Sequence, residues 1–174
     1  MRSAHPAHPH RLAARLWRVA LLLPLLAMIW CLPAAPAAAA VDVAKQVLIG
    51  ADYHGQDLRG ATFNLTNLRD ADLSGADLQG ASLFGAKLQD ADLSNTNLRE
   101  ATLDSAVFDS TDLRNAVLEN AFAFNTKFSG ALRVEGADFT NVPLRGDALK
   151  SLCAVASGTN PVTGRETRDT LGCS

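Results

Sequence analysis

Three aspartates recur at intervals of 20 residues, at Asp72, Asp92 and Asp112. In a chain that returns to the same position every 20 residues, their carboxylates would form an acidic column with neighbours about 5 Å apart. Such a column could hold Ca²⁺ or Mg²⁺ weakly, because both ions prefer oxygen ligands. The alternative, which we favour, is that each Asp accepts hydrogen bonds from nearby backbone amides while water screens the remaining charge.

Cysteine and histidine are the other residue types here that could do chemistry. Cys153 and Cys173 lie near the C-terminus, and such a pair could form a disulfide, bind a metal or supply a catalytic thiol. His54 is the sole histidine after residue 40, which leaves no zinc-ligand spacing and no Ser/His/Asp set. The sequence also has no P-loop. We therefore predict that the protein is not an enzyme and binds no cofactor.

A repeat of five residues must position these side chains, and it runs from about residue 51 to 144. Its central apolar position is filled in 13 consecutive units, at Leu58, Phe63, Leu68, Leu73, Leu78, Leu83, Leu88, Leu93, Leu98, Leu103, Phe108, Leu113 and Leu118. A small residue, mostly Ala or Thr, stands two positions before each. A period of five fits neither a helix nor a strand. It predicts a solenoid in which the central and small residues point inward and the other three face water. Each inward Thr must donate its hydroxyl to a backbone carbonyl.

The units carry a family resemblance. Residues 71–75, 76–80 and 91–95 read ADLSG, ADLQG and ADLSN, and the chain resembles the pentapeptide-repeat family, whose pattern is A(D/N)LXX. The resemblance implies an all-β solenoid, a right-handed quadrilateral β-helix with four units per coil. Residues 20 apart would then stack at about 4.8 Å. One ladder would contain Leu58, Leu78, Leu98 and Leu118, and another Leu68, Leu88, Phe108 and Phe128.

Late in the repeat the pattern changes. Ala123 takes a central position between Phe122 and Phe124, which with Phe84 occupy outward positions on one side of the four-sided coil. These three phenylalanines are a possible interaction surface, because exposed aromatic residues are typical of interfaces. The alternative, which we favour, is that one Phe turns inward to fill the room left by Ala123. From Val134 onward the repeat is one residue out of step, which predicts an extra residue within 129–133.

Residues 1–40 predict a cleaved signal peptide. They contain four Arg and no acidic residue, an apolar stretch from Val19 to Trp30, and three alanines before the expected cleavage at Val41. The apolar stretch is short for a membrane span, so we expect no stable membrane anchor after cleavage. The remaining chain has 12 basic and 18 acidic residues, a net charge of −6. That charge disfavours nucleic acids and anionic membranes as partners.

Both ends of a solenoid expose its core in cross-section and need covers. We assign residues 41–50 to an N-terminal cap, 51–144 to the β-helix and 145–174 to a C-terminal cap that begins with a short helix at 147–155. In an exported chain, Cys153 and Cys173 are expected to close this cap as a disulfide. The tail also resembles that of exported pentapeptide-repeat proteins from the thylakoid lumen of cyanobacteria and chloroplasts, which implies an oxidising lumenal or periplasmic location.

Three functions are compatible with these features. The leading interpretation is an exported, non-enzymatic scaffold of the thylakoid lumen or periplasm that binds an unidentified protein partner. The second is an acidic DNA mimic that binds a nucleic-acid enzyme such as gyrase, which the export signal disfavours because gyrase is cytosolic. The third is a lumenal hydrolase or redox enzyme that uses Cys153 and Cys173, which a reactive thiol of low pKa would support.

Overall fold

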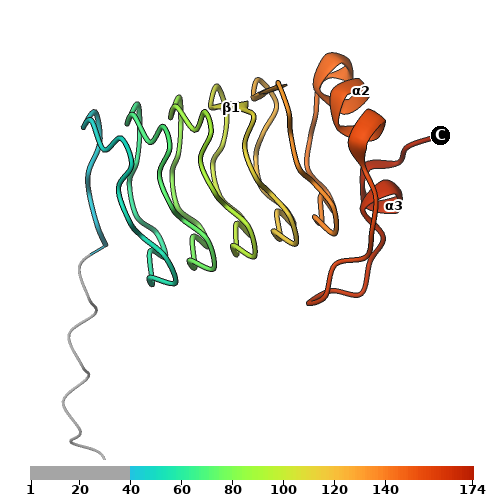
Figure 1. The fold of residues 1–174 in the computed structure, drawn as a ribbon, viewed down its shortest axis with the longest axis horizontal. Coiled ribbons are helices and arrows are strands. Elements are labelled where there is room, and N and C mark those ends of the chain that lie inside the picture. Colours follow the sequence, from blue (N-terminus) through green and yellow to red (C-terminus); the bar gives the residue numbers. More distant parts are fainter. Residues whose placement is uncertain (1–39) are drawn as a thin grey trace, which may run out of the picture. The chain divides into compact units, whose positions relative to one another are not determined.

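The computed structural model describes residues 40–174 (Figure 1). The predicted signal peptide therefore lies outside the described residues, apart from Ala40. Within the described part, the chain winds as a stack of coils that begins near residue 41 and ends against two helices.

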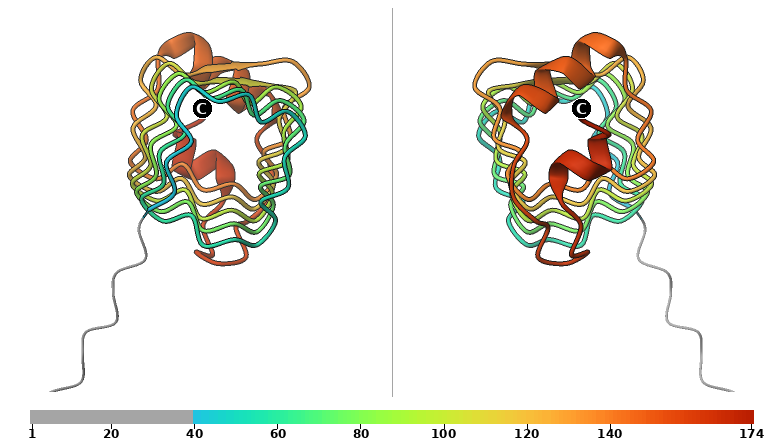
Figure 2. Two further views of the ribbon diagram at one scale, coloured as in Figure 1. Left: turned by 90° about the vertical axis from the view of Figure 1, so that its left-hand side faces the viewer. Right: turned by 90° about the vertical axis from the view of Figure 1, so that its right-hand side faces the viewer.

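Each coil has four sides of five residues. Parallel β-bridges join residues 20 apart on every side, such as Thr62↔Ser82, Asn67↔Lys87, Asp72↔Asp92 and Asp77↔Asn97. A view down the stack shows the four-sided outline (Figure 2). On one side the pairing extends over three residues, giving the parallel strands β1 (Val107–Asp109) and β2 (Lys127–Ser129), with Phe108 opposite Phe128. These observations confirm a solenoid whose coils repeat every four units.

Corners between sides place the fifth residue of most units in the left-handed region of backbone conformation, with φ of 67° at Gly75 and 58° at Asn95. Gly and Asn adopt this conformation at low cost, which explains why they recur there. The amide of Gly75 then donates to the carbonyl of Ser94 in the next coil at 2.8 Å. Each corner therefore contributes to the coil-to-coil hydrogen bonding.

The core is a filled stack of the central and small residues. Leu78 and Leu98 have no exposed surface, and the amide of Leu78 donates to the carbonyl of Asn97 on the next rung at 2.8 Å. The second ladder ends in aromatic rings, since Phe108 and Phe128 stack with centroids 5.1 Å apart. Both predicted ladders are thus confirmed. Inward threonines also behave as expected, with Thr111 donating its hydroxyl to the carbonyl of Leu88 at 2.7 Å.

The first coil differs from the prediction. Residues 41–50 form two regular sides rather than a cap, because Asp42 bridges to Thr62 and Val47 bridges to Asn67. Their inward residues are Val43 and Leu48, which continue the central positions, with Val in place of Leu or Phe at the first of them. These two units were not recognised in the sequence because Val41 and Gln46 stand where later units have a small residue, mostly Ala or Thr.

The predicted extra residue is confirmed. Val107 pairs with Lys127, 20 residues on, whereas Asp112 pairs with Arg133, 21 residues on. The insertion therefore falls between Ser129 and Arg133. Gly130 lies here with φ of 71°, and a Cβ at this position would collide with side-chain oxygens of Asp109 and Ser110 in the coil before. The bulge thus requires glycine.

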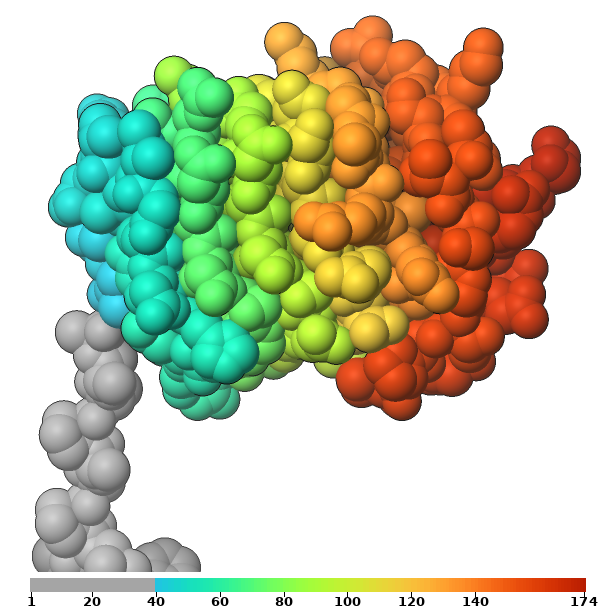
Figure 3. All heavy atoms as spheres, in the orientation of Figure 1, coloured from blue at the N-terminus to red at the C-terminus, as the bar shows by residue number. Residues whose placement is uncertain are grey.

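Two helices cover the C-terminal end of the stack (Figure 1), where the last residues form one continuous surface with the coils (Figure 3). Helix α2 (Gly146–Val155) corresponds to the predicted helix and buries Ala148 and Leu152 against the core. Helix α3 (Thr167–Leu171) lies in the part of the predicted cap for which the sequence analysis expected no helix, and it buries Leu171. The predicted disulfide is confirmed, with Cys153 and Cys173 joined at an S–S distance of 2.02 Å.

Candidate interaction surfaces and the C-terminal junction

The aromatic side is the surface formed by Phe84, Phe122, Phe124 and Leu65. These side chains are 42%, 52%, 48% and 52% exposed, respectively. Phe84 and Phe124 share a position two coils apart, with Asp104 between them. The side therefore carries apolar groups on a ladder that elsewhere presents polar residues.

Neither Phe122 nor Phe124 turns inward, so that expectation is wrong. Both flank the inward Ala123, which has no exposed surface, and residues on either side of an inward position point outward in an extended chain. Ala148 and Leu152 of α2 belong to the same buried cluster as Ala123. At this end of the stack the helix therefore adds apolar side chains to the same core.

The acidic column forms as predicted, with Asp72, Asp92 and Asp112 bridged in succession. Each Oδ1 accepts a hydrogen bond from the backbone amide two residues on, at 2.9 Å for Asp72, 2.8 Å for Asp92 and 3.1 Å for Asp112. Among residues 40–174, no group of three or more His, Cys, Asp or Glu side chains could hold a metal ion. The local backbone role therefore explains these aspartates.

Asp112 departs from the prediction that these positions face water. Its side chain is 2% exposed and lies between Arg114, at 2.7 Å, and Arg133, at 3.4 Å. Burial alone would raise the pKa of Asp112, but hydrogen bonds from Arg114 and the charge of Arg133 hold it below its ordinary value. The column therefore ends in a carboxylate whose negative charge is balanced by two arginines.

A serine, a histidine and an aspartate do meet on the surface, contrary to the prediction. His54 Nδ1 lies 2.8 Å from Ser74 Oγ, which donates to Asp72 Oδ1 at 2.5 Å. In a catalytic triad the carboxylate binds the imidazole and the imidazole takes the serine proton. Here the hydroxyl is committed to the carboxylate, so this group is a surface hydrogen-bond chain that the 20-residue spacing of His54 and Ser74 could have revealed.

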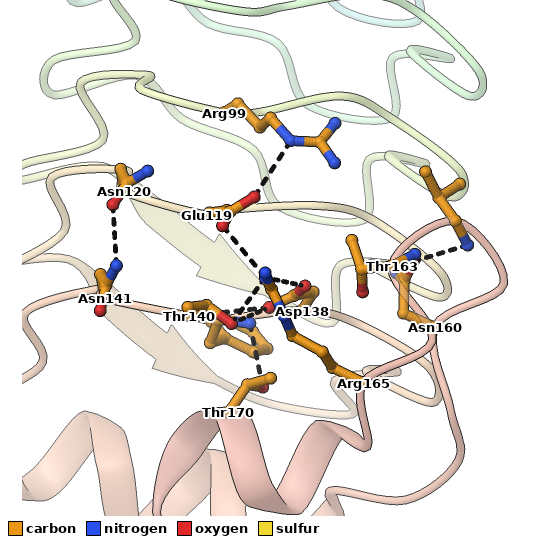
Figure 4. A network of polar contacts seen from close by, with 12 residues as sticks. Arg99, Glu119, Asn120, Asp138, Thr140, Asn141, Asn160, Thr163, Arg165 and Thr170 are labelled. Carbon is orange, nitrogen blue, oxygen red and sulfur yellow. Dashed lines mark hydrogen bonds and ion pairs between the residues drawn. The ribbon is translucent and has the colours of Figure 1, made fainter.

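The C-terminal junction is a polar network between the tail and the last coils (Figure 4). Arg165 Nη1 lies 3.1 Å from both Glu119 Oε1 and Asp138 Oδ2, and Asp138 has no exposed side-chain surface. Burial would raise the pKa of Asp138, but hydrogen bonds from Thr140 and the charge of Arg165 hold it below its ordinary value. Arg165 lies 25 to 46 positions from its three partners in the sequence, so no repeat signal points to these contacts.

Asn160 fastens the same tail to the stack. Its Nδ2 donates to the carbonyl of Gly136 at 2.7 Å, and its Oδ1 accepts from the amides of Val162 and Thr163 at 2.9 Å each.

An open cleft of about 540 Å³ lies beside the junction, lined by residues that include Thr140, Arg165 and Asp169. Because Arg165 is already paired with two carboxylates, it does not offer a free charge to a ligand in this cleft.

Comparison with known proteins decides the family. The family model for pentapeptide repeats matches residues 47–83 and 81–120. A solved pentapeptide repeat protein from the Arabidopsis thaliana thylakoid lumen is 47% identical, with a TM-score of 0.72 over 74% of this chain and 89% of that chain. This chain belongs to the pentapeptide repeat family. The likeness to this solved relative implies that the stack is a right-handed β-helix.

Two curated relatives of this pentapeptide repeat protein are also from Arabidopsis thaliana. The thylakoid lumenal 15 kDa protein 1 is 56% identical over 50 residues, and the thylakoid lumenal protein TL20.3 is 46% identical over 44 residues. These matches span 29% and 25% of this chain, and 22% and 16% of the two relatives. Within residues 40–174 of this pentapeptide repeat protein, no helix has the length and apolar character to cross a membrane.

Proposed function

We propose that this protein is a non-enzymatic scaffold, exported to the thylakoid lumen, whose aromatic side binds a protein partner. The location is supported by the lumenal relatives, by the signal peptide predicted from residues 1–40 and by the disulfide, which suits an oxidising compartment. A non-enzymatic role is supported by the solid core, because the interior of the β-helix is filled with side chains and leaves only the exterior to act.

The observation that carries the proposal is the exposure of Phe84, Phe122 and Phe124. A partner that covers these exposed apolar side chains lowers the free energy of the complex by about 25 cal/mol for each Å² of apolar area removed from water. Flat β-ladders present such rings without a cost in backbone rearrangement, and aromatic residues are enriched at the centres of protein interfaces. A protein surface with an apolar centre therefore fits this side.

Polar groups border the aromatic side and would set the orientation of the partner. Asp104 lies on the rung between Phe84 and Phe124, and its Oδ1 accepts from the amide of Asn125 at 2.8 Å. Asn64 Oδ1 likewise accepts from the amide of Phe84 at 3.2 Å. These side chains hold fixed positions through backbone contacts, so the partner meets a preorganised rim around the rings.

The structure does not favour a DNA mimic that binds gyrase. Such a mimic needs an uninterrupted line of negative charge, whereas Arg114 and Arg133 neutralise Asp112 at one end of the acidic column. Asp57 and Asp77 on the neighbouring side are likewise accompanied by Arg59.

The test is capture of a partner from thylakoid lumen by the exported protein. The variants Phe84→Asp and Phe124→Asp place charges on the aromatic side without touching the core. The control is Val162→Asp, a change of the same kind at a tail side chain that is 70% exposed. We expect the unchanged protein and the control to retain one stoichiometric partner and both aromatic variants to lose it. Equal retention by all four proteins would refute the proposed surface.

A further inference from the structure

The N-terminal end of the stack is open within residues 40–174, unlike the C-terminal end, which α2 and α3 cover (Figures 1 and 2). Phe63, Leu68 and Leu73, the central residues of the second coil, have no exposed surface. Their counterparts in the first coil, Val43, Leu48 and Tyr53, are only partly buried, whereas Leu58, the fourth central residue of that coil, is 2% exposed. The first coil therefore presents an apolar cross-section at its outer face.

Hydrogen-bonding groups surround this cross-section. In the second coil, the amides of Thr62 and Asp72 donate back to the carbonyls of Val41 and Ala51 at 2.7 Å and 2.9 Å. The equivalent first-coil amides, at Asp42, Val47, Asp52 and Asp57, have no such partner among residues 40–174. An edge of this kind is a template for pairing with another strand.

We propose that the first coil is the docking surface for a second copy of this chain, so that two β-helices join end to end at their N-terminal coils. The tail occupies the opposite end, so a copy cannot stack head to tail there. A closed contact between two identical surfaces is isologous and has two-fold symmetry. The two-fold rotation reverses the chain direction, which makes the facing sides antiparallel.

The charges of the first coil are complementary under this symmetry. With the two-fold axis through the middle of side 41–45, Val43 faces Val43 of the second copy, and Asp42 of one copy lies beside Lys45 of the other. The same axis passes through side 51–55, where Asp52 faces His54. Because of the symmetry, each of these contacts occurs twice, once on either side of the axis. No two like charges face each other in this arrangement.

The apolar residues match as well. Tyr53 faces Tyr53 of the second copy, and the two remaining sides pair with one another, which sets Leu48 against Leu58. Stacking of the two cross-sections thus continues the core across the contact. The contact removes from water the partly exposed surfaces of Val43, Leu48 and Tyr53. In every later coil, the preceding coil covers the equivalent surfaces.

The mass in solution tests this contact. The full chain is expressed and recovered as the cell processes it, and sedimentation equilibrium is measured over a range of protein concentrations. We expect a reversible species of twice the chain mass. Val43→Lys places two like charges opposite each other and raises the dissociation constant by at least about tenfold. Val162→Lys, the same change on the tail, leaves it unaltered.

A cross-link provides a second measurement. Facing residues of an antiparallel pair are about 4.5–5.5 Å apart, within reach of a disulfide. Val43→Cys should therefore form a covalent dimer under mild oxidation, whereas Val162→Cys should not. A monomer, with or without residues 1–39, would overturn the proposal. So would oligomers larger than two, a dimer indifferent to Val43→Lys, or equal cross-linking of both cysteine variants.

Discussion

Arg165 places a guanidinium nitrogen 3.1 Å from a carboxylate oxygen of Asp138, whose side chain has no exposed surface. The two residues belong to different parts of the fold, since Arg165 lies in the tail and Asp138 in the last coil. Arg99 and Arg165 also bind the two oxygens of Glu119, at 3.3 Å and 3.1 Å. The tail therefore both covers the end of the stack and neutralises a buried carboxylate there.

Replacing Arg165 should destabilise the protein by leaving Asp138 without its cationic partner. We expect Arg165→Gln to lower the free energy of unfolding, by less than the loss of one partner from a fully buried pair because Arg165 itself is half-exposed. Chemical denaturation measures the change. Arg69→Gln is the control, since Arg69 has an exposed side chain without an ion pair among the described residues. Equal losses for the two variants would contradict this role of Arg165.

The folded chain should lose stability only when the pH falls below about 4. A hydrogen bond from the Arg59 side chain is the main cause that lowers the pKa of Asp57 to about 2, and the pKa values of Asp72, Asp112 and Asp138 are also lowered. Unfolding returns each Asp to a pKa of about 3.9. The stabilisation is therefore present above pH 4 and is lost as the pH falls through the folded-state pKa values.

Thermal unfolding monitored by circular dichroism checks this pH dependence. The titration of these aspartates should change the midpoint temperature little between pH 7 and pH 5. Below about pH 4 the midpoint temperature should decrease. Asp112→Asn should flatten the acid-side slope, because its charge no longer titrates. A fall that begins near neutral pH would show that groups other than these aspartates control the stability.

Asn160 should be required for docking of the tail. Asn160→Ala removes the donor to Gly136 and the acceptor of two backbone amides, and each unmet buried group costs about 1–3 kcal/mol. We expect a protease to cleave residues 156–166 faster in this variant than in the unchanged protein. Asn125→Ala serves as the exposed control, where two long side-chain contacts are lost, one of 3.5 Å to Asp104 and one of 3.4 Å to Arg145. Unchanged cleavage of the Asn160 variant would show that the tail is held by other contacts.

The disulfide should stabilise the tail rather than the coils. Cys153→Ser together with Cys173→Ser opens a loop of 20 residues and should cost about 3 kcal/mol by the chain-entropy model. Hydrogen exchange should show loss of protection in α2 and α3, with the ladder from Leu58 to Leu118 unaffected. Loss of protection throughout the stack would mean that folding of the coils depends on a closed tail.

Contacts that follow the five-residue period were predictable from the sequence. Leu78 and Leu98 stack because the same residue type returns after each coil, and Asp72 caps the amide of Ser74 because both lie in one unit. The insertion before Arg133 was visible as a shift of phase. The pairing of Cys153 with Cys173 followed from the small number of cysteines beyond residue 40.

Contacts between residues that the five-residue repeat does not relate to one another appeared only in the tertiary structure. The insertion sets Arg133 opposite Asp112 on the next coil, and the pairing of Arg165 with Asp138 depends on where the tail folds back. The outward orientation of both Phe122 and Phe124, on either side of the buried Ala123, was likewise visible only in the structure. A period specifies which residues recur at one position, because backbone geometry repeats with it. The direction taken by a non-repeating segment depends on side-chain packing that no local pattern encodes.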